Sequence, residues 1–470
     1  MKKSLVALAV LAASGAYAQS SVTLFGIVEA TTDIGYNRTQ DGTVTTNTFN
    51  AAGNGLTSTT TSTSSSQKNN FRVQDGSSQG SGSSRVGFRG TEDLGGGLKA
   101  NFLLEMGLRV DDGCTTLGGV VGAFGTAPTA LNSVACNNGG NSENSGGATF
   151  GRNAWGGLSG GFGEVRLGRQ VLGSFGVQGN SGSSGASNGL YDASTATLSA
   201  MGGVRFSNAI RYLSPNFGGF TGSLMLAAPE TAGNTTSTST TAAGVVTTAN
   251  ASRRTGVDLA LEYANGPAYI GFGYNKNDSA NSVASTTPSG LGSTAVSALP
   301  TTTTAYTLGG SYDLGVVKPF INYTRQNGNA RSSTAFTSVT AGGDTFTSTT
   351  GDTTQRALSI GLRAPVGAFT VIAGYGRSTT TGNTLAPTTG AGFTTTIAGR
   401  TETKVDAFQL GAQYALSKRT LVEANYGYNK SRGDTSGVTT STVAGAGRIE
   451  TFERNNVRIS ALNVGLKHSF

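Results

Sequence analysis

The chain has 470 residues and a formal net charge of +8, with 72 glycines, 12% charged residues and 8% aromatic residues. The aromatic content argues against a wholly disordered chain. The basic residues are dispersed and the glycine spacings follow no βαβ pattern, which excludes a nucleic-acid-binding patch and a nucleotide-binding loop.

The first 18 residues have the three parts of a secretory signal peptide. Lys2 and Lys3 form a basic start, an apolar run follows at 5–13, and Ala16-Tyr17-Ala18 supplies small residues for cleavage. The run is too short to cross a bilayer, and no later stretch approaches about 18 consecutive apolar residues. We therefore expect an exported chain of residues 19–470 that could enter a membrane only as a closed β-barrel.

Period-two alternation of apolar and polar residues recurs in runs of about ten residues. The connections alternate between short turns rich in Gly, Pro and Asn and long tracts rich in Thr, Ser, Gly and Asn. The pattern predicts an all-β chain with sixteen strands near residues 22–36, 83–93, 98–110, 148–157, 164–170, 205–214, 219–228, 254–264, 268–277, 305–313, 316–326, 356–364, 368–378, 403–416, 420–430 and 456–470. This is the layout of a sixteen-stranded antiparallel transmembrane β-barrel with short periplasmic turns, long extracellular loops and an aqueous lumen.

The last strand illustrates an ambiguity in this pattern. Leu462 and Leu466 share one face, whereas Asn463 and Lys467 share the other. In a soluble sandwich the apolar face would be buried in a core, and in a membrane barrel it would face lipid. Alternation alone does not separate the two folds, but the signal peptide, the strand count and the lack of residues for a bulky core favour the barrel.

Two cysteines, Cys114 and Cys136, lie in one Gly/Asn-rich segment. In an exported protein this arrangement predicts a disulfide that closes the loop, and a metal site is the alternative. The only histidine, His468, lies far from both cysteines, so we expect neither a metal nor another cofactor. A lone histidine close to the C-terminus also argues against a hydrolytic triad, and no enzymatic activity is expected.

Motifs spread over nearly every predicted strand resemble the general porins of Gram-negative bacteria, of the trimeric sixteen-stranded betaproteobacterial type. They are SSVTLFGIVEA at 20–30, SRVGFRGTEDLGGGLKANFLLE at 84–105, FGEVRLGRQ at 162–170, IRYLSPNFGGF at 210–220, LEYANGP at 261–267, LRAPVGAFT at 362–370, LGAQYALSKRT at 410–420 and VGLKHSF at 464–470. The long loops do not match. The resemblance implies an outer-membrane homotrimer in contact with lipid and lipopolysaccharide, a third loop folded into the pore, and Phe470 as a signal for the barrel-assembly machinery.

The resemblance also implies a basic wall at the pore constriction, facing the third loop. By their positions in the matching motifs, Arg85, Arg152 and Arg205 are its best candidates. Arg169 is a weaker candidate because strict alternation turns it outward, although it lies at a strand end. Rings of arginine select anions, and a low-dielectric wall focuses their field. In the alternative interpretation these arginines are solvated wall residues or partners of acids on neighbouring strands.

Strand parity places further charges in the lumen, because a charge facing lipid at the midplane costs about 2–4 kcal/mol. The predicted luminal charges are Glu29, Asp33, Arg89, Lys99, Glu105 and Arg211. The third loop, 171–204, carries one acid, Asp192. If Arg152 faces the lumen, alternation along the strand turns Trp155 outward, where it could belong to an aromatic girdle at the membrane interface. Arg89, Glu92 and Asp93 are expected to pair with each other or with neighbours near a periplasmic turn.

These observations predict a channel for passive diffusion of small hydrophilic solutes and ions, with an anion preference. A solute-specific channel is one alternative, and it would need a ladder of aromatic side chains or a dedicated luminal site. A surface adhesin or structural barrel is another, favoured by the long Thr-rich loops. Conductance across a planar bilayer distinguishes an open pore from a closed barrel.

Overall fold

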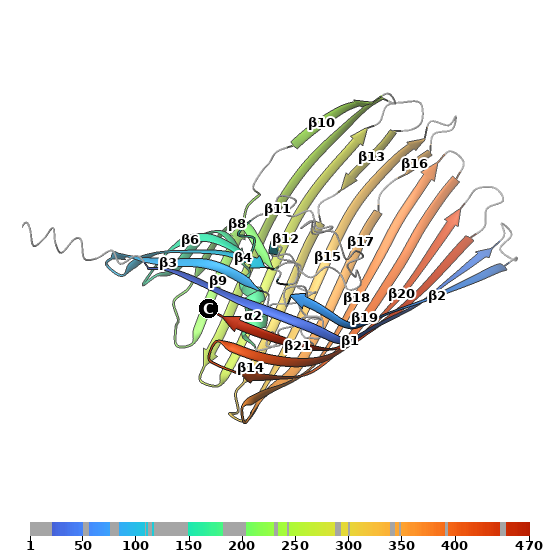
Figure 1. The fold of residues 1–470 in the computed structure, drawn as a ribbon. Coiled ribbons are helices and arrows are strands. Elements are labelled where there is room, and N and C mark those ends of the chain that lie inside the picture. The colour runs from blue at the N-terminus through green and yellow to red at the C-terminus, as the bar shows by residue number, and fades with distance from the viewer. Residues whose placement is uncertain are drawn as a thin grey trace, which may run out of the picture.

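The barrel is seen in a computed structural model that describes residues 21–49, 56–75, 84–108, 110, 115–116, 149–181, 204–229, 234–241, 244–286, 293–298, 301–338, 344–346, 349–390, 393–441 and 448–470. Sixteen strands in these ranges form one closed antiparallel barrel, and each overlaps a strand predicted from the sequence (Figure 1). They are β1 (Ser21–Phe49), β3 (Arg85–Gly95), β4 (Leu98–Leu108), β6 (Asn153–Gly160), β7 (Gly163–Val171), β8 (Arg205–Leu213), β9 (Phe220–Ala227), β11 (Gly244–Asn265), β12 (Ala268–Thr286), β14 (Thr301–Tyr312), β15 (Lys318–Ser338), β17 (Thr349–Val366), β18 (Phe369–Gly390), β19 (Phe393–Ala415), β20 (Thr420–Ser441) and β21 (Arg448–Ser469).

The two ends of the strand series close the barrel against each other. β1 pairs with β3 through residues 21–27 and with β21 through residues 27–48. Gly26 and Phe470 exchange two backbone hydrogen bonds of 3.0 Å, so the C-terminal residue is held in the seam. Because neighbouring strands are all antiparallel, an even number of them brings both ends of the barrel to the same rim.

The apolar faces of the strands lie on the outside. Leu462 and Leu466 are 39% and 48% exposed, whereas Asn463 between them is fully buried. The exposed set includes leucine, isoleucine, valine and aromatic side chains of nearly every barrel strand. A soluble sandwich would bury this set, so the barrel alternative is confirmed. Among the helices of the described chain, none is long and apolar enough to span a membrane.

The long Thr/Ser-rich connectors differ in part from the prediction, because much of their described length is strand. β1 continues to Phe49, and β2 (Leu56–Asp75) folds back along it. Additional strands in the connectors are β5 (Thr115–Thr116), β10 (Asn234–Thr241), β13 (Ser293–Ala298) and β16 (Asp344–Phe346). Threonine is β-branched and favours strands, and a hairpin satisfies its own backbone groups without a core. The wall from β11 to β21 is therefore tall, and the wall from β3 to β9 is short (Figure 1).

Candidate pore constriction

A short helix, α2 (Gly173–Asn180), follows β7 and packs against the luminal face of the barrel wall. It begins the connection that the sequence predicts to fold into the pore. Ser174 Oγ accepts a hydrogen bond of 3.2 Å from Asn275 Nδ2, and the Ser181 hydroxyl donates one of 2.8 Å to Asn322 Oδ1. Both asparagines are buried side chains of wall strands, β12 and β15. The described part of the loop is thus fixed to the wall and occupies space inside the barrel.

The start of α2 is capped by a side chain that lies 85 positions away in sequence. Asp258 of β11 accepts hydrogen bonds from the backbone N–H of Gly173 at 2.6 Å and of Ser174 at 3.2–3.3 Å. The N-cap residue itself, Leu172, is apolar and supplies no cap. A carboxylate at a helix N-terminus satisfies donors that the helix leaves unpaired and complements the positive end of its dipole. Asp258 therefore anchors α2 to the wall.

Wall glycines leave the space that α2 fills. A Cβ on Gly273 would lie 2.7 Å from the Cα of Ser174, and one on Gly309 would lie 3.1 Å from the carbonyl oxygen of Val177. The C-terminal end is held by Glu262, which accepts hydrogen bonds from Asn180 Nδ2 at 2.7 Å and from a wall tyrosine hydroxyl at 2.8 Å. Close packing against the wall glycines and hydrogen bonds at both ends fix the position of α2 on the barrel wall.

The three arginines predicted for the basic wall lie close together. Arg152 donates from Nε to Glu105 Oε1 at 2.6 Å, and Arg205 donates from Nε to the carbonyl oxygen of Arg152 at 2.7 Å. Arg85 is near enough to interact electrostatically with both Arg152 and Glu105. These side chains come from β3, β4, β8 and the residue before β6, which places them on one part of the wall.

Arg169 joins this group, although strict alternation predicts that it faces lipid. Its guanidinium donates to the carbonyl oxygen of Gly151 and to Ser207 Oγ, both at 2.6 Å, and it interacts electrostatically with Arg205. The register of β7 with β8 shifts between Gly168 and Gln170, and the extra residue lies on β8, where Asn208 has a φ of 49°. Gly168 itself has a φ of +127°, which glycine tolerates, and beside this irregular backbone the guanidinium of Arg169 reaches Gly151 and Ser207. Alternation along β7 alone therefore does not give the position of the Arg169 guanidinium.

The arginine cluster, defined as Arg85, Arg152, Arg169 and Arg205, carries more positive charge than its described neighbours cancel. Glu105 is its closest described acid and is only 7% exposed. Glu29 and Asp33 face the lumen as predicted and are fully buried. Glu29 forms an ion pair with a lysine at 3.4 Å, and Asp33 accepts a hydrogen bond from an asparagine at 2.9 Å. Asp192, the acid expected on the third loop, lies outside the described residues, as do Cys114 and Cys136.

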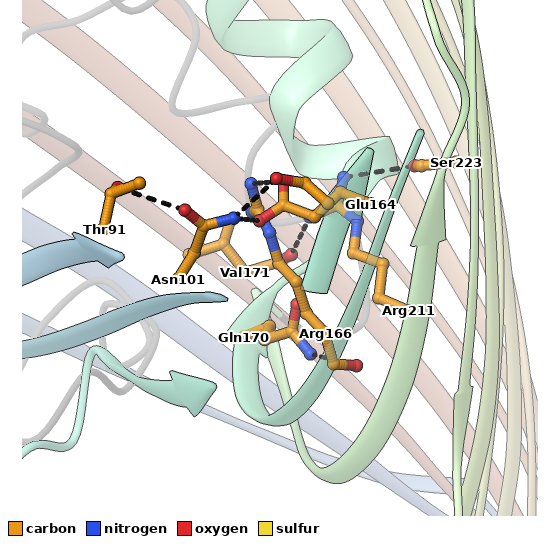
Figure 2. A network of polar contacts seen from close by, with 9 residues as sticks. Thr91, Asn101, Glu164, Arg166, Gln170, Val171, Arg211 and Ser223 are labelled. Atoms are coloured by element: carbon orange, nitrogen blue, oxygen red, sulfur yellow. Dashed lines mark hydrogen bonds and ion pairs between the residues drawn. The ribbon is translucent and has the colours of Figure 1, made fainter. Parts of the chain in front are cut away.

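Arg211 and Lys99 are two further charges predicted for the lumen. Arg211 donates to the carbonyl oxygen of Val171 at 3.0 Å and to a serine hydroxyl of β9 at 3.1 Å, and so holds the chain where it leaves β7 (Figure 2). Lys99 is exposed on the same face, near the β3–β4 turn.

Arg89 does not pair with Glu92 or Asp93 in the described chain, so the first of the two predicted arrangements is not observed. The guanidinium of Arg89 lies over the ring of Phe25, 5.4 Å from its centre, and Asp93 accepts a hydrogen bond from a turn N–H. The sequence positions of Arg89 and Glu92 differ by an odd number, so the two side chains point to opposite faces of β3. This geometry accounts for the absence of an Arg89–Glu92 ion pair.

Sequence reasoning missed a second polar network on the luminal face. Thr91 donates to Asn101 Oδ1 at 3.0 Å, Asn101 Nδ2 lies 3.4 Å from Glu164 Oε1, and Arg166 donates to Glu164 Oε2 at 2.6 Å (Figure 2). The network crosses β3, β4 and β7. The alternation of Glu164 and Arg166 with Val165 and Leu167 was the signal that could have revealed it, because Leu167 is 60% exposed on the outer face.

Trp155 belongs to this luminal network and not to an outer girdle. It is in register with Leu103 of β4 and Gly168 of β7, and the guanidinium carbon of Arg166 lies 4.1 Å from its ring centre. The prediction that placed it in the girdle counted parity from Arg152. Arg152 precedes β6, and its ion pair with Glu105 sets the direction of its side chain. The alternation of side chains along β6 therefore cannot be counted from Arg152.

Comparisons with known proteins agree with the barrel and its pore. The family model described as Gram-negative porin matches residues 4–434. Outer membrane porin protein 32 of Delftia acidovorans is 34% identical over 327 residues, 68% of this chain and 68% of its own length. An outer membrane porin protein of Bordetella pertussis is 29% identical over 440 residues, 92% of this chain and 94% of its own length. The solved structure of the anion-selective porin from Comamonas acidovorans aligns with a TM-score of 0.50 and 25% identity, over 96% of this chain and 100% of that chain.

Proposed function

Since this chain belongs to the Gram-negative porin family and forms an outer-membrane β-barrel, we propose that it is a general diffusion channel whose lumen favours small hydrophilic anions. The arginine cluster is the observation that carries the proposal. Its four arginines come from β3, β7, β8 and the residue before β6 and interact with one another, and Glu105 is the acid in direct contact with Arg152. We propose that their guanidinium groups line the constriction. A fixed excess of positive charge in a water-filled constriction raises the local concentration of anions and repels cations.

The anchored helix supports the same proposal. α2 lies against β9, β11, β12 and β14, whereas the arginine cluster lies on β3 to β8. A permeating ion would pass between a wall that is basic and a loop that narrows the lumen. The similarity to a porin that is itself anion-selective supports this direction of selectivity.

Reversal potentials in a salt gradient test the proposal. The double variant Arg85→Glu, Arg152→Glu changes the luminal charge by four units and should convert anion preference into cation preference. The double variant Lys418→Glu, Arg419→Glu makes the same change of charge on an exposed turn between β19 and β20 and should leave the reversal potential unchanged. Wild-type selectivity in the luminal variant, with an open pore, would remove the arginine cluster from the constriction.

We further propose that residues 1–18 are removed on export and that residues 19–470 assemble as a trimer in the outer membrane, with Phe470 read by the barrel-assembly machinery. The short wall supports the trimer. Ala154 and Gly156 are outward positions of β6, in register with outward residues of β4. Small outward side chains let barrels approach closely. Light scattering of the detergent-solubilised protein measures its mass and tests the stoichiometry.

A surface role is the second candidate, and the tall hairpins of β1–β2 and β10–β11 favour it. These hairpins are polar and extend well beyond the length that crosses a bilayer. Bilayer recording separates the candidates, because a structural or adhesive barrel need not conduct whereas a diffusion channel conducts ohmically.

A further inference from the structure

On the outer face of β15, β17 and β18, arginines lie at the end of the apolar band that is farther from the short turns. On β15, Ile321 and Tyr323 are 51% and 40% exposed, whereas Asn322 and Thr324 are fully buried. Arg325 is the next residue of the exposed set, so it points away from the lumen. It cannot contribute to ion selection inside the pore.

Three arginines gather here on adjacent strands. Arg325 of β15 is directly in register with Arg356 of β17, and Arg377 of β18 is in register with Leu358, the next outward residue of β17. Side chains directly opposite each other in antiparallel strands have Cβ atoms about 4.5–5.5 Å apart, and like charges in such positions are destabilising. The Arg325–Arg356 pair is therefore unfavourable unless an anion lies between the two guanidinium groups.

The protein supplies little negative charge to relieve this repulsion. Arg377 is neutralised by Asp406, at 2.9 Å and 3.4 Å. The outward positions in register with or diagonal to Arg325 and Arg356 hold threonine, leucine, tyrosine, asparagine or Arg377, and none of them is acidic. In the described chain, Arg325 and Arg356 are exposed and neither has an ion pair within the protein.

The strand length places this group at one edge of the hydrocarbon. About ten residues separate Arg356 from Val366, the exposed apolar residue at the short-turn end of β17, and 9–11 residues of a tilted strand cross a bilayer. Tyr323 and Tyr375 lie on the same outer face, between the arginines and the apolar band. Aromatic girdles mark membrane interfaces in this way. The long hairpins rise from the same edge, which identifies it as the external one.

We propose that Arg325 and Arg356, with Arg377 beside them, form a binding site for the phosphate groups of an anionic lipid of the outer leaflet. Guanidinium groups bind phosphate bidentately, and a phosphate between Arg325 and Arg356 would relieve their mutual repulsion. A lipid is the occupant because the site adjoins the apolar band and the tyrosines, which contact acyl chains, while the arginines meet its headgroup. The inference rests on the outer-membrane location in the proposed function, but it involves the opposite face of the wall from the pore.

Native mass spectrometry of the detergent-solubilised full chain, titrated with diphosphorylated lipid A, tests the site. The double variant Arg325→Gln, Arg356→Gln should bind roughly tenfold less of this lipid, since hydrogen bonds to charged groups are lost. The matched luminal variant Arg85→Gln, Arg205→Gln removes the same charge and should bind the lipid like the wild type. Phosphatidylcholine, which is zwitterionic, should be retained weakly by all three proteins.

A second variant keeps the arginines in place. Thr379→Glu, in register with Arg356, would offer an internal carboxylate and should also weaken lipid A binding. Equal lipid A binding by the wild type and both outer-face variants would overturn the site, as would equal loss in the luminal variant. Failure of the proposed function is measured separately, because it appears as unchanged reversal potential in the luminal variants and leaves lipid binding unaffected.

Discussion

Replacing Asp258 with alanine should detach the start of α2 from the barrel wall. Asp258 is fully buried and accepts backbone hydrogen bonds from both Gly173 and Ser174, the shortest at 2.6 Å. No other side chain caps this end of the helix in the described chain, because the N-cap residue, Leu172, makes no side-chain hydrogen bond to it. The whole loss therefore falls on the attachment of the helix and not on the barrel, whose strand pairing is untouched.

The size of the effect can be worked from the two donors. Hydrogen bonds to a charged acceptor contribute about 1.5–3 kcal/mol each, and loss of an N-cap costs about 0.5–2 kcal/mol. The start of α2 is buried, and water that enters after the substitution would solvate part of it, so we expect a loss of about 2 kcal/mol for Asp258→Ala. That corresponds to roughly a thirtyfold shift toward the detached helix. Asp258→Asn keeps an acceptor without its charge and should cost about half as much.

Single-channel recording in planar bilayers is the assay. A helix that leaves the wall more often should increase open-channel noise and lower the voltage at which the pore closes, with Asp258→Asn intermediate. Asp434→Ala is the matched control, because Asp434 is exposed and bonds to an arginine on the neighbouring strand, far from α2 in the chain. If both Asp258 variants have the noise and closure voltage of the wild type, the carboxylate does not anchor α2.

Three further predictions concern packing, orientation and redox state. Gly309→Ala should weaken the packing of α2 by about 1–3 kcal/mol and raise channel noise, whereas Gly310→Ala, whose new methyl group would meet nothing closer than 3.6 Å, should have no effect; similar noise in both variants would contradict the tight fit. Iodide should quench the emission of Trp155, the only tryptophan, and brominated acyl chains should not, because its ring faces the lumen; the reverse pattern would return it to the lipid face. Non-reducing peptide mass spectrometry should detect a Cys114–Cys136 crosslink, and two free thiols would refute the disulfide.

The sequence by itself was sufficient for the set of barrel strands and for the face on which most side chains lie. Alternation with a period of two is a local property, so Leu462 and Asn463 could be assigned to opposite faces without knowledge of their neighbours. The same argument predicts that Arg85, Glu105 and Arg211 face the lumen.

Only the tertiary structure decided the features that depend on register or on distant partners. Arg169 joins the arginine cluster through hydrogen bonds to Gly151 and Ser207, beside a register shift between β7 and β8 that the alternation of β7 does not reveal. Asp258 caps a helix 85 positions earlier in the chain, and closure of the barrel sets Arg325 opposite Arg356. Pairing between strands is decided by the whole closed sheet, so which charges become neighbours cannot be read from any one strand.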